Sequence, residues 1–432
     1  MHFTRLHASR RGAVAAALAT AVVACGSAHA EPVAAVQDLA RQQQQPLLDT
    51  LRDLVSIESG SKDVEGLEKI AALIAERLRA LGGAIEIVPP SDVYRMEDTP
   101  AKTGAMVKAE WKGTGTKRIL LIAHMDTVYL RGMLKDQPFR VDETNGRAYG
   151  LGIADDKQGI ALILHTVAML DKLAFKDYGT LTVLINGDEE ISSPGSRSTI
   201  SRVASTQDAV FSFEGGGRDG GVRLATSGIG SAYLTVEGRA SHAGANPEGG
   251  VNALYELAHQ LLQLRDLSQN DKGLKLNWTV AQAGTNRNVI PARATAQADA
   301  RALRVADFEQ LQAKLQERVR NQLVPDAKVQ LKFEVRRPPL EPTPASRALA
   351  AHSKAIYDEL GMTMTIADVA TGGGTDAAFA ALQAKGAVVE GFGLTGFGAH
   401  SNNAEYVRLD SIVPRLYLTT RLVMDVAQDK VK

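Results

Sequence analysis

Imidazole and acidic side chains recur in this sequence at points where apolar, strand-like runs end. The first case is a His-Met-Asp triplet, residues 124–126, which directly follows the run RILLIA at 118–123. Side chains alternate along an extended chain, so His124 and Asp126 face the same way. An imidazole there can bind a metal ion while the carboxylate fixes its tautomer. A loop histidine beside a solvated aspartate is the simpler alternative, and this short motif alone does not exclude it.

Two pairs of neighbouring carboxylates stand in comparable places. Asp155 and Asp156 open a helical pattern, where adjacent aspartates repel each other unless a cation or a helix N-terminus neutralises them. Glu189 and Glu190 follow the apolar run 181–185. Neighbouring side chains at a strand end point in different directions, so one carboxylate could bind metal while the other acts as a general base. A helix N-cap pair and solvated loop residues are the alternatives.

Glu214 and His400 complete the set, because each comes after a further strand-like run, at 209–213 and 387–392. Two histidines and several carboxylates in one domain suit hard-to-borderline divalent cations such as zinc. Cys25 is the only cysteine and lies in the N-terminal segment, so a mature chain without that segment would hold no disulfide and no thiolate ligand. The sequence therefore predicts a metal site built from His, Asp and Glu.

The elements that would position these residues alternate between helical and strand-like patterns. Helices are expected at 36–56, 64–81, 157–170 and 409–426, and strands at 118–123, 181–185, 209–213 and 387–392. Continuous apolar strands alternating with helices are typical of an α/β fold whose mostly parallel sheet is buried on both faces. The functional site of such a sheet lies at the carboxyl ends of its strands, which is where the polar motifs stand.

The pattern changes between residues 227 and 337. Strands are expected at 232–237, 277–282, 294–301 and 329–335, and helices at 251–264 and 307–323. The order β-α-β-β-α-β is that of a ferredoxin-like α+β unit. The sequence therefore predicts a catalytic domain in two parts, 31–226 and 338–432, interrupted by an inserted domain, 227–337.

Composition and the N-terminal segment narrow the class of protein. The 432 residues carry 49 basic and 49 acidic side chains, a balance that argues against a nucleic-acid-binding protein. No apolar run approaches the ~18–20 residues of a membrane-spanning helix. Residues 1–30 are typical of a signal peptide, with arginines, an apolar run at 13–24 and Ala-His-Ala at 28–30. A periplasmic or secreted protein is expected. The pair Arg10-Arg11 leaves the twin-arginine route open, and Cys25 leaves lipidation open.

Eight motifs run along the chain in a fixed order. They are HMDTV (124–128), GIADDK (152–157), DEE (188–190), SFE (212–214), SHAGA (241–245), NVIPA (288–292), TGGGTDAA (371–378) and GFGAHSNNAEY (396–406). Together they resemble the di-zinc exopeptidase family of aminoacylases, desuccinylases and glutamate carboxypeptidases. The similarity covers nearly all of the mature chain and is greatest to the bacterial glutamate carboxypeptidases that hydrolyse folates.

This resemblance implies two zinc ions per subunit. One would be bound by His124 and Glu214, the other by Glu190 and His400, and Asp155 would bridge them. A cis peptide bond after the bridging aspartate is also implied.

The same resemblance implies an activity and its catalytic residues. The activity is hydrolysis of the amide bond to a C-terminal amino acid, with glutamate as the first candidate. Glu189 would be the general acid and base. Asp126 is counted with the catalytic residues because its carboxylate would fix the tautomer of His124. His242 would stabilise the oxyanion, delivered by the inserted domain of the other subunit in a homodimer.

The substrate's free carboxylate calls for a cationic partner, because a planar guanidinium matches a carboxylate in bidentate fashion. By resemblance Arg337 holds this carboxylate. The predicted substrate-binding residues are Arg337, Arg301, Asn288, Gly373, Gly374 and Thr375.

One loop departs from the family's pattern. Gly221 and Arg223 stand where the glutamate-specific enzymes carry a lysine and a serine. This keeps an N-acyl-amino-acid or dipeptide hydrolase with the same metals open as the alternative. A non-catalytic binding protein on this fold would be expected to lose Glu189 or a metal ligand, and the chain keeps them all.

Overall fold

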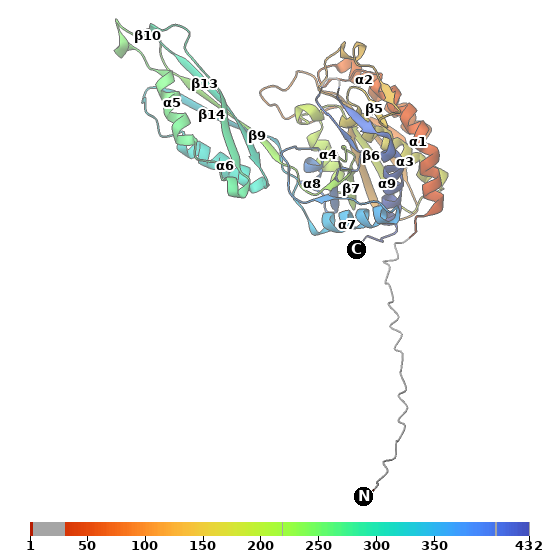
Figure 1. The fold of residues 1–432 in the computed structure, drawn as a ribbon. Coiled ribbons are helices and arrows are strands. Elements are labelled where there is room, and N and C mark those ends of the chain that lie inside the picture. Colours follow the sequence, from red (N-terminus) through yellow and green to blue (C-terminus); the bar gives the residue numbers. More distant parts are fainter. Residues whose placement is uncertain (3–30, 218, 402–403, 432) are drawn as a thin grey trace.

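The computed structural model describes residues 1–2, 31–217, 219–401 and 404–431 (Figure 1). The features on which the expected signal peptide depends, including the paired arginines and Cys25, therefore lie outside the described residues. Among the described helices, none is both long enough and apolar enough to cross a membrane.

Eight strands form the central sheet of the larger body (Figure 1). In spatial order they are β1 (Ala84–Val88), β2 (Met106–Lys112), β6 (Thr180–Asn186), β3 (Arg118–His124), β7 (Ala209–Ser212), β16 (Ala387–Glu390), β8 (Val222–Arg223) and β15 (Ile366–Ala367). The middle strands β6, β3, β7 and β16 are parallel to one another. The mostly parallel α/β sheet expected from the sequence is thus confirmed.

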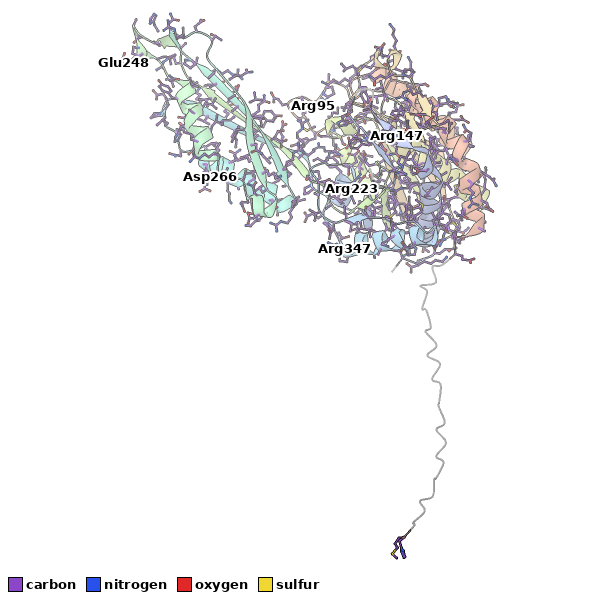
Figure 2. All side chains as sticks on the ribbon, viewed as in Figure 1. Arg95, Arg147, Arg223, Glu248, Asp266 and Arg347 are labelled. Atoms are coloured by element: carbon purple, nitrogen blue, oxygen red, sulfur yellow. The ribbon has the colours of Figure 1, made fainter. Side chains whose placement is uncertain are left out.

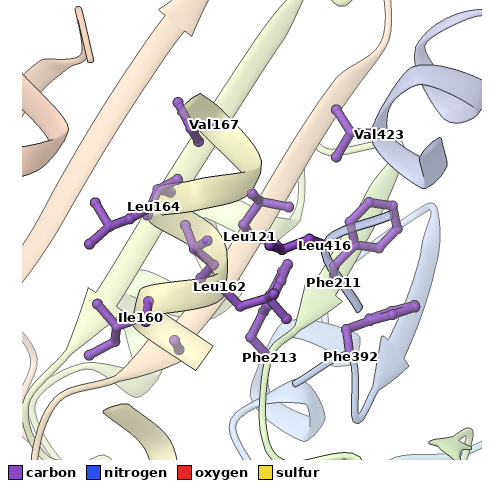
Figure 3. Close-up of a cluster of buried hydrophobic side chains, with 14 of the residues drawn as sticks. Leu121, Ile160, Leu162, Leu164, Val167, Phe211, Phe213, Phe392, Leu416 and Val423 are labelled. Atoms are coloured by element: carbon purple, nitrogen blue, oxygen red, sulfur yellow. The ribbon is translucent and has the colours of Figure 1, made fainter. Parts of the chain in front are cut away.

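Helices cover both faces of this sheet. On one face lie α1 (Ala34–Val55), α2 (Val64–Ala80), α3 (Gln158–Lys172), α7 (Pro344–Glu359) and α9 (Ile412–Ala427); on the other lie α4 (Arg197–Ala204) and α8 (Ala377–Ala381). Figure 3 shows Leu121 and Phe211 of the strands packed with side chains of α3 and α9. Leu120 and Ile122 belong to the opposite hydrophobic cluster. Strand β3 is therefore buried on both faces, which explains why its sequence is an unbroken apolar run.

A second sheet of four antiparallel strands lies beside the larger body (Figure 1). Its order is β11 (Lys275–Ala283), β13 (Arg293–Ala302), β9 (Gly228–Glu237) and β14 (Lys328–Arg337). Two helices, α5 (Ala253–Leu264) and α6 (Val305–Arg318), share a separate hydrophobic cluster with it. Buried and partly exposed residues alternate along β9, as expected for a sheet with only one covered face.

The order of the longer elements in this region is the predicted one, and the largest differences are a longer β9, which begins at Gly228, and a shorter helix α6. Helix α6 ends at Arg318 instead of residue 323. The carbonyls of Val319 and Asn321 instead accept hydrogen bonds from Gln260 of α5. The neighbouring helix thus binds the chain just beyond the end of α6.

Two small sheets hold loops that carry predicted site residues. One contains β4 (Arg140–Asp142), β5 (Arg147–Tyr149), β18 (Tyr406–Arg408) and β17 (Gly396–Phe397), and the other contains β10 (Ser241–His242) and β12 (Val289–Ile290). The first lies on the larger body, and the second belongs to the region of the second sheet.

Candidate metal centre

The parallel strands of the central sheet end at one edge and bring the predicted residues there together. His124 is the last residue of β3, Glu214 lies just beyond β7, and Glu189 and Glu190 begin the short helical turn η3 (Glu189–Ile191) after β6. Asp155 comes from the turn η2 (Ile153–Lys157), which leads into α3.

Asp155 lies between the two histidines. Its Oδ1 is 3.0 Å from His124 Nε2, and its Oδ2 is 3.2 Å from His400 Nε2. Glu214 Oε1 lies 3.4 Å from His124 Nε2, and Glu190 Oε2 lies 3.0 Å from His400 Nε2. The structure therefore brings all five predicted ligands into one cluster, paired as the resemblance implied. The peptide bond between Asp155 and the next residue is cis.

Asp156 is a neighbour of the cluster that sequence reasoning did not assign. It lies close enough to His124 and Glu214 to share a metal ion with them. Its oxygens, however, accept hydrogen bonds from Gln158 Nε2 at 2.7 Å and from the backbone N–H of His124 at 3.4 Å. The two oxygens of Asp155 face the two histidines. We therefore assign the bridging position between the two metal sites to Asp155, and we assign to Asp156 the role of holding the backbone of His124 by a hydrogen bond.

The electrostatics of the cluster favour bound cations. Burial, together with the charge of Asp155, raises the pKa values of Glu190 and Glu214 to about 7. Contacts with Asp155 and Glu190 raise the pKa of His400 to about 11. Burial opposes ionisation of Asp155, but its contacts with His124 and His400 outweigh burial and lower its pKa. Crowded, desolvated carboxylates with two imidazoles are a donor set that fits zinc.

Asp126 contacts both His124 and the turn that carries Glu189 and Glu190. It is fully buried, and its Oδ1 lies 3.3 Å from His124 Nδ1. It also accepts the backbone N–H groups of Glu189 at 3.0 Å and Glu190 at 3.1 Å, and the hydroxyl of Ser61 at 2.7 Å. One carboxylate thus orients the imidazole and fixes the turn that carries the two glutamates, which is how outer-shell residues tune a metal site.

Glu189 and Arg337 form a buried ion pair. Arg337 Nη1 lies 2.8 Å from Glu189 Oε1, and Nη2 donates to the backbone carbonyl of Glu189 at 2.7 Å. Burial raises the pKa of Glu189, and the charge of Arg337 acts in the opposite direction. The predicted carboxylate clamp is only 3% exposed. In this structure it therefore contacts the candidate base instead of lying open to a substrate.

Asp376 was missed by sequence reasoning. It is buried, its Oδ1 is 2.9 Å from Arg337 Nη1, and it also accepts from Asn186 Nδ2 at 2.8 Å and from the Ser193 hydroxyl. The only signal was its place beside Thr375 in a quoted motif. Asp376 and Glu189 thus share the same nitrogen of Arg337.

The predicted glycine loop lies where the second sheet joins the larger body. Arg301 Nη1 donates to the carbonyl of Gly372 at 3.2 Å, and the carbonyl of Gly373 accepts from Ser227 N at 2.8 Å. A Cβ on Gly374 would lie 2.7 Å from Arg337 Cδ, so the close approach requires glycine there.

Two partly exposed residues beside this junction are held by hydrogen bonds. Thr375 Oγ1 donates to Glu390 Oε2 at 2.8 Å. Arg223, at the position that departs from the family pattern, donates to the carbonyl of Gly215 at 2.9 Å and lies 3.4 Å from Glu390 Oε1. The guanidinium of Arg223 is thus partly occupied by the protein itself.

His242 and Asn288 lie apart from the cluster. Both are exposed. His242 lies on β10 and Asn288 directly precedes β12, which pairs with β10, and Ala243 N donates to the Asn288 carbonyl at 2.9 Å. His242 Nδ1 accepts from the N–H groups of the following turn. Figure 1 shows β10 at the end of the second sheet farthest from the larger body, and Figure 2 labels Glu248 at the same end. Within one chain these residues do not reach the cluster.

Comparison with known sequences gives one family. Residues 120–425 match the sequence pattern of peptidase family M20/M25/M40. The sequence is 43% identical to carboxypeptidase G2 of Pseudomonas sp. (strain RS-16) over 422 residues, which cover 97% of this chain and 99% of that one. It is 31% identical to acetylornithine deacetylase of Shigella sonnei over 230 residues, covering 51% of this chain and 56% of that enzyme.

Solved structures agree at the level of the fold. The aminopeptidase PepT of Bacillus cereus superposes with a TM-score of 0.72 at 20% sequence identity, over 89% of this chain and 99% of that one.

Proposed function

The chain belongs to peptidase family M20/M25/M40, and on this basis we propose that it is a zinc carboxypeptidase. It would hydrolyse the amide bond to a C-terminal amino acid, with glutamate as the first candidate. The observation that carries the proposal is the position of Asp155, whose two oxygens lie 3.0 and 3.2 Å from His124 Nε2 and His400 Nε2. The 43% identity to a carboxypeptidase over almost the full length supports the reaction.

Two zinc ions would be held by the five clustered side chains. His124 and Glu214 would bind one, Glu190 and His400 the other, and Asp155 both. Bound zinc supplies a water of lowered pKa and polarises the substrate carbonyl.

Glu189 is the residue of this chain that would move the proton. It lies next to a proposed ligand, it is buried, and its carboxylate is oriented by Arg337 and by the backbone contact to Asp126. A general base in this place takes a proton from the attacking water and returns it to the leaving nitrogen.

A homodimer would complete the site with His242 of the partner subunit. Helix α5 exposes an apolar stripe, with Leu254 at 43%, Tyr255 at 63% and Leu262 at 62% of their full accessibility. Strand β11 beside it is an edge strand of its sheet, and an unpaired edge next to an apolar face is suited to pairing with another chain. A two-fold axis here would use the same surface on both subunits.

Sedimentation analysis tests this assembly. Leu262→Glu should convert a dimer into a monomer, whereas Val369→Glu, at a residue of the larger body that is 66% exposed, should leave the dimer intact. A monomeric wild-type protein would contradict the proposal.

A periplasmic or secreted location is proposed from residues 1–30. N-terminal sequencing of the protein purified from its native host tests it, because cleavage after Ala30 predicts a mature chain that begins at Glu31. A mature chain that still begins at Met1 would contradict export by cleavage.

An N-acyl-amino-acid hydrolase is the second candidate. It is favoured by Arg223, which contacts Glu390 and the Gly215 carbonyl, at a position where the glutamate-specific pattern differs. A panel of pteroyl, benzoyl and acetyl derivatives of several amino acids separates the two candidates. We expect the highest kcat/KM for C-terminal glutamate. A strong preference set by the acyl group, with little effect of the C-terminal residue, would favour the second candidate.

A further inference from the structure

We propose that Glu405 is a positioning residue of the metal centre, which holds the loop of Asp155 in the orientation that lets this carboxylate face both histidines. The inference rests on the proposed function, because it concerns how tightly the centre binds zinc. Glu405 follows His400 in the motif GFGAHSNNAEY (396–406). The family resemblance implied a role for His400 but none for Glu405.

The carboxylate of Glu405 accepts hydrogen bonds from three successive parts of the Asp155 loop. Oε2 accepts from the backbone N–H of Gly152 at 3.0 Å, and Oε1 accepts from those of Ala154 at 2.8 Å and Asp155 at 3.2 Å. The side chain is only 3% exposed, so water does not compete for these donors. The backbone of the loop is therefore fixed from the C-terminal part of the chain.

A fourth contact joins the same carboxylate to the segment of His124. The hydroxyl of Tyr129 donates to Glu405 Oε2 at 2.5 Å. Glu405 thus connects three segments that carry proposed ligands: those of His124, Asp155 and His400. Each is remote from the others in the sequence, so a single carboxylate sets their relative positions.

Every one of these partners is a donor, which explains why a carboxylate is needed. An ionised carboxylate has two oxygens that only accept, whereas an amide of the same shape has one accepting oxygen and one donating NH₂ group. In Glu405→Gln, whichever way the amide is turned, its NH₂ group faces at least one backbone N–H. The loop would have to move away from that repulsion.

Asp126 offers a parallel within the same site. It accepts the backbone N–H groups of Glu189 and Glu190, just as Glu405 accepts those of the Asp155 loop. Two buried carboxylates therefore each hold one ligand-bearing turn by its main chain. Replacing outer-shell partners of this kind typically weakens metal affinity or activity by roughly 10- to 100-fold.

The experiment measures zinc affinity by competition with a chromophoric chelator, using the full mature chain. Glu405→Gln should bind zinc about 10- to 100-fold more weakly than the wild type. The matched control is Glu256→Gln in the region of the second sheet. Glu256 is also fully buried and accepts the backbone N–H groups of Leu323 at 2.9 Å and Val324 at 2.7 Å, but it contacts no residue of the metal centre.

Glu256→Gln should lower the melting temperature of the metal-free protein and leave its zinc affinity unchanged. Equal losses of zinc affinity in the two variants, or an unchanged affinity in Glu405→Gln, would assign Glu405 to the fold alone and overturn the inference. The proposed function would then still stand, because wild-type binding and hydrolysis would be intact. A wild-type chain that binds no zinc would overturn both.

Tyr129→Phe keeps the inference testable if Glu405→Gln does not fold. This variant removes one of the four hydrogen bonds and leaves the carboxylate in place. It should weaken zinc binding measurably, by a factor of up to about 10, since it removes one hydrogen bond to a charged acceptor. An affinity equal to that of the wild type would count against a role of Glu405 in orienting the ligands.

Discussion

Two histidines with proposed roles differ in burial. One lies at the carboxyl ends of the parallel strands of the central sheet, and the other lies at the outer end of the second sheet. His124 is 1% exposed and contacts Asp126, Asp155 and Glu214. His242 is exposed, and the contacts of its ring are with the N–H groups of its own turn. The first site is assembled within one chain. At the second site, His242 could take part in catalysis only if a second subunit brought its metal centre close to it.

This difference follows from how each region is packed. The central sheet is covered on both faces, so its parallel strands end among buried groups, and polar residues there must find partners or bind a cation. The second sheet has one open face, and its outer turn is short and solvated. A buried site can be recognised from strand ends along one sequence, whereas the role proposed for His242 was expected only from the family resemblance.

Metal removal should have the largest effect, and it acts only on the first region. Chelation, or His124→Ala, should reduce turnover by at least about 10³-fold, because the zinc ions would supply several kcal/mol of transition-state stabilisation. Activity and zinc content are measured together, and added zinc should restore the chelated wild type but not the variant. Full turnover by a chain shown to be free of metal would refute a metal centre.

Glu189→Gln should lower kcat by at least ~10²-fold with the zinc content unchanged, because the amide keeps the shape of the side chain but cannot accept the proton. Single-turnover kinetics at saturating substrate measure this loss. Near-normal turnover would rule out Glu189 as the base.

His242→Ala tests the second region and should cost about 10²-fold in kcat, in the range found for an oxyanion donor. The comparison becomes sharper when this variant is mixed with Glu189→Gln. Each heterodimer then contains one site with both residues intact, so equal mixing should restore roughly a quarter of wild-type activity in a two-fold dimer. If subunits exchange without any recovery, His242 does not act across the interface.

Arg337 lies between the two regions, at the end of β14. Arg337→Ala should give the smallest of these losses, roughly 10- to 100-fold in kcat/KM, as expected for a charge-assisted contact of about 1.5–3 kcal/mol. We expect the loss on substrates with a free C-terminal carboxylate and little change on amidated ones. Equal losses on both would mean that Arg337 serves Glu189, with which it is paired in this structure.

The sequence pointed to His124, Glu190, Glu214 and His400 because each follows a strand-like run, and to Asp155 because it opens a helical pattern. Their pairing as metal ligands was expected from the family resemblance. It did not assign Asp376 or Glu405, although both lie in quoted motifs. Their partners, such as Arg337 and Gly152, are remote in sequence, and a buried carboxylate that accepts backbone N–H groups has no local signature. Strand β1, at one edge of the central sheet, and its neighbour β2 were also missed. Half-exposed residues in β1 dilute the apolar run that marks a buried strand.

The way the second sheet is connected has a consequence for modularity. Its first and last strands, β9 and β14, are hydrogen-bonded neighbours, with Arg337 opposite Ile229, so the chain leaves the larger body and returns to it at adjacent points. All five proposed metal ligands lie outside these strands. The region between them can therefore be exchanged for another module, or for a short turn, without opening the framework that holds the ligands. The region between β9 and β14, which carries the proposed dimer surface and His242, could thus be varied separately from the strands and turns that hold the proposed metal ligands.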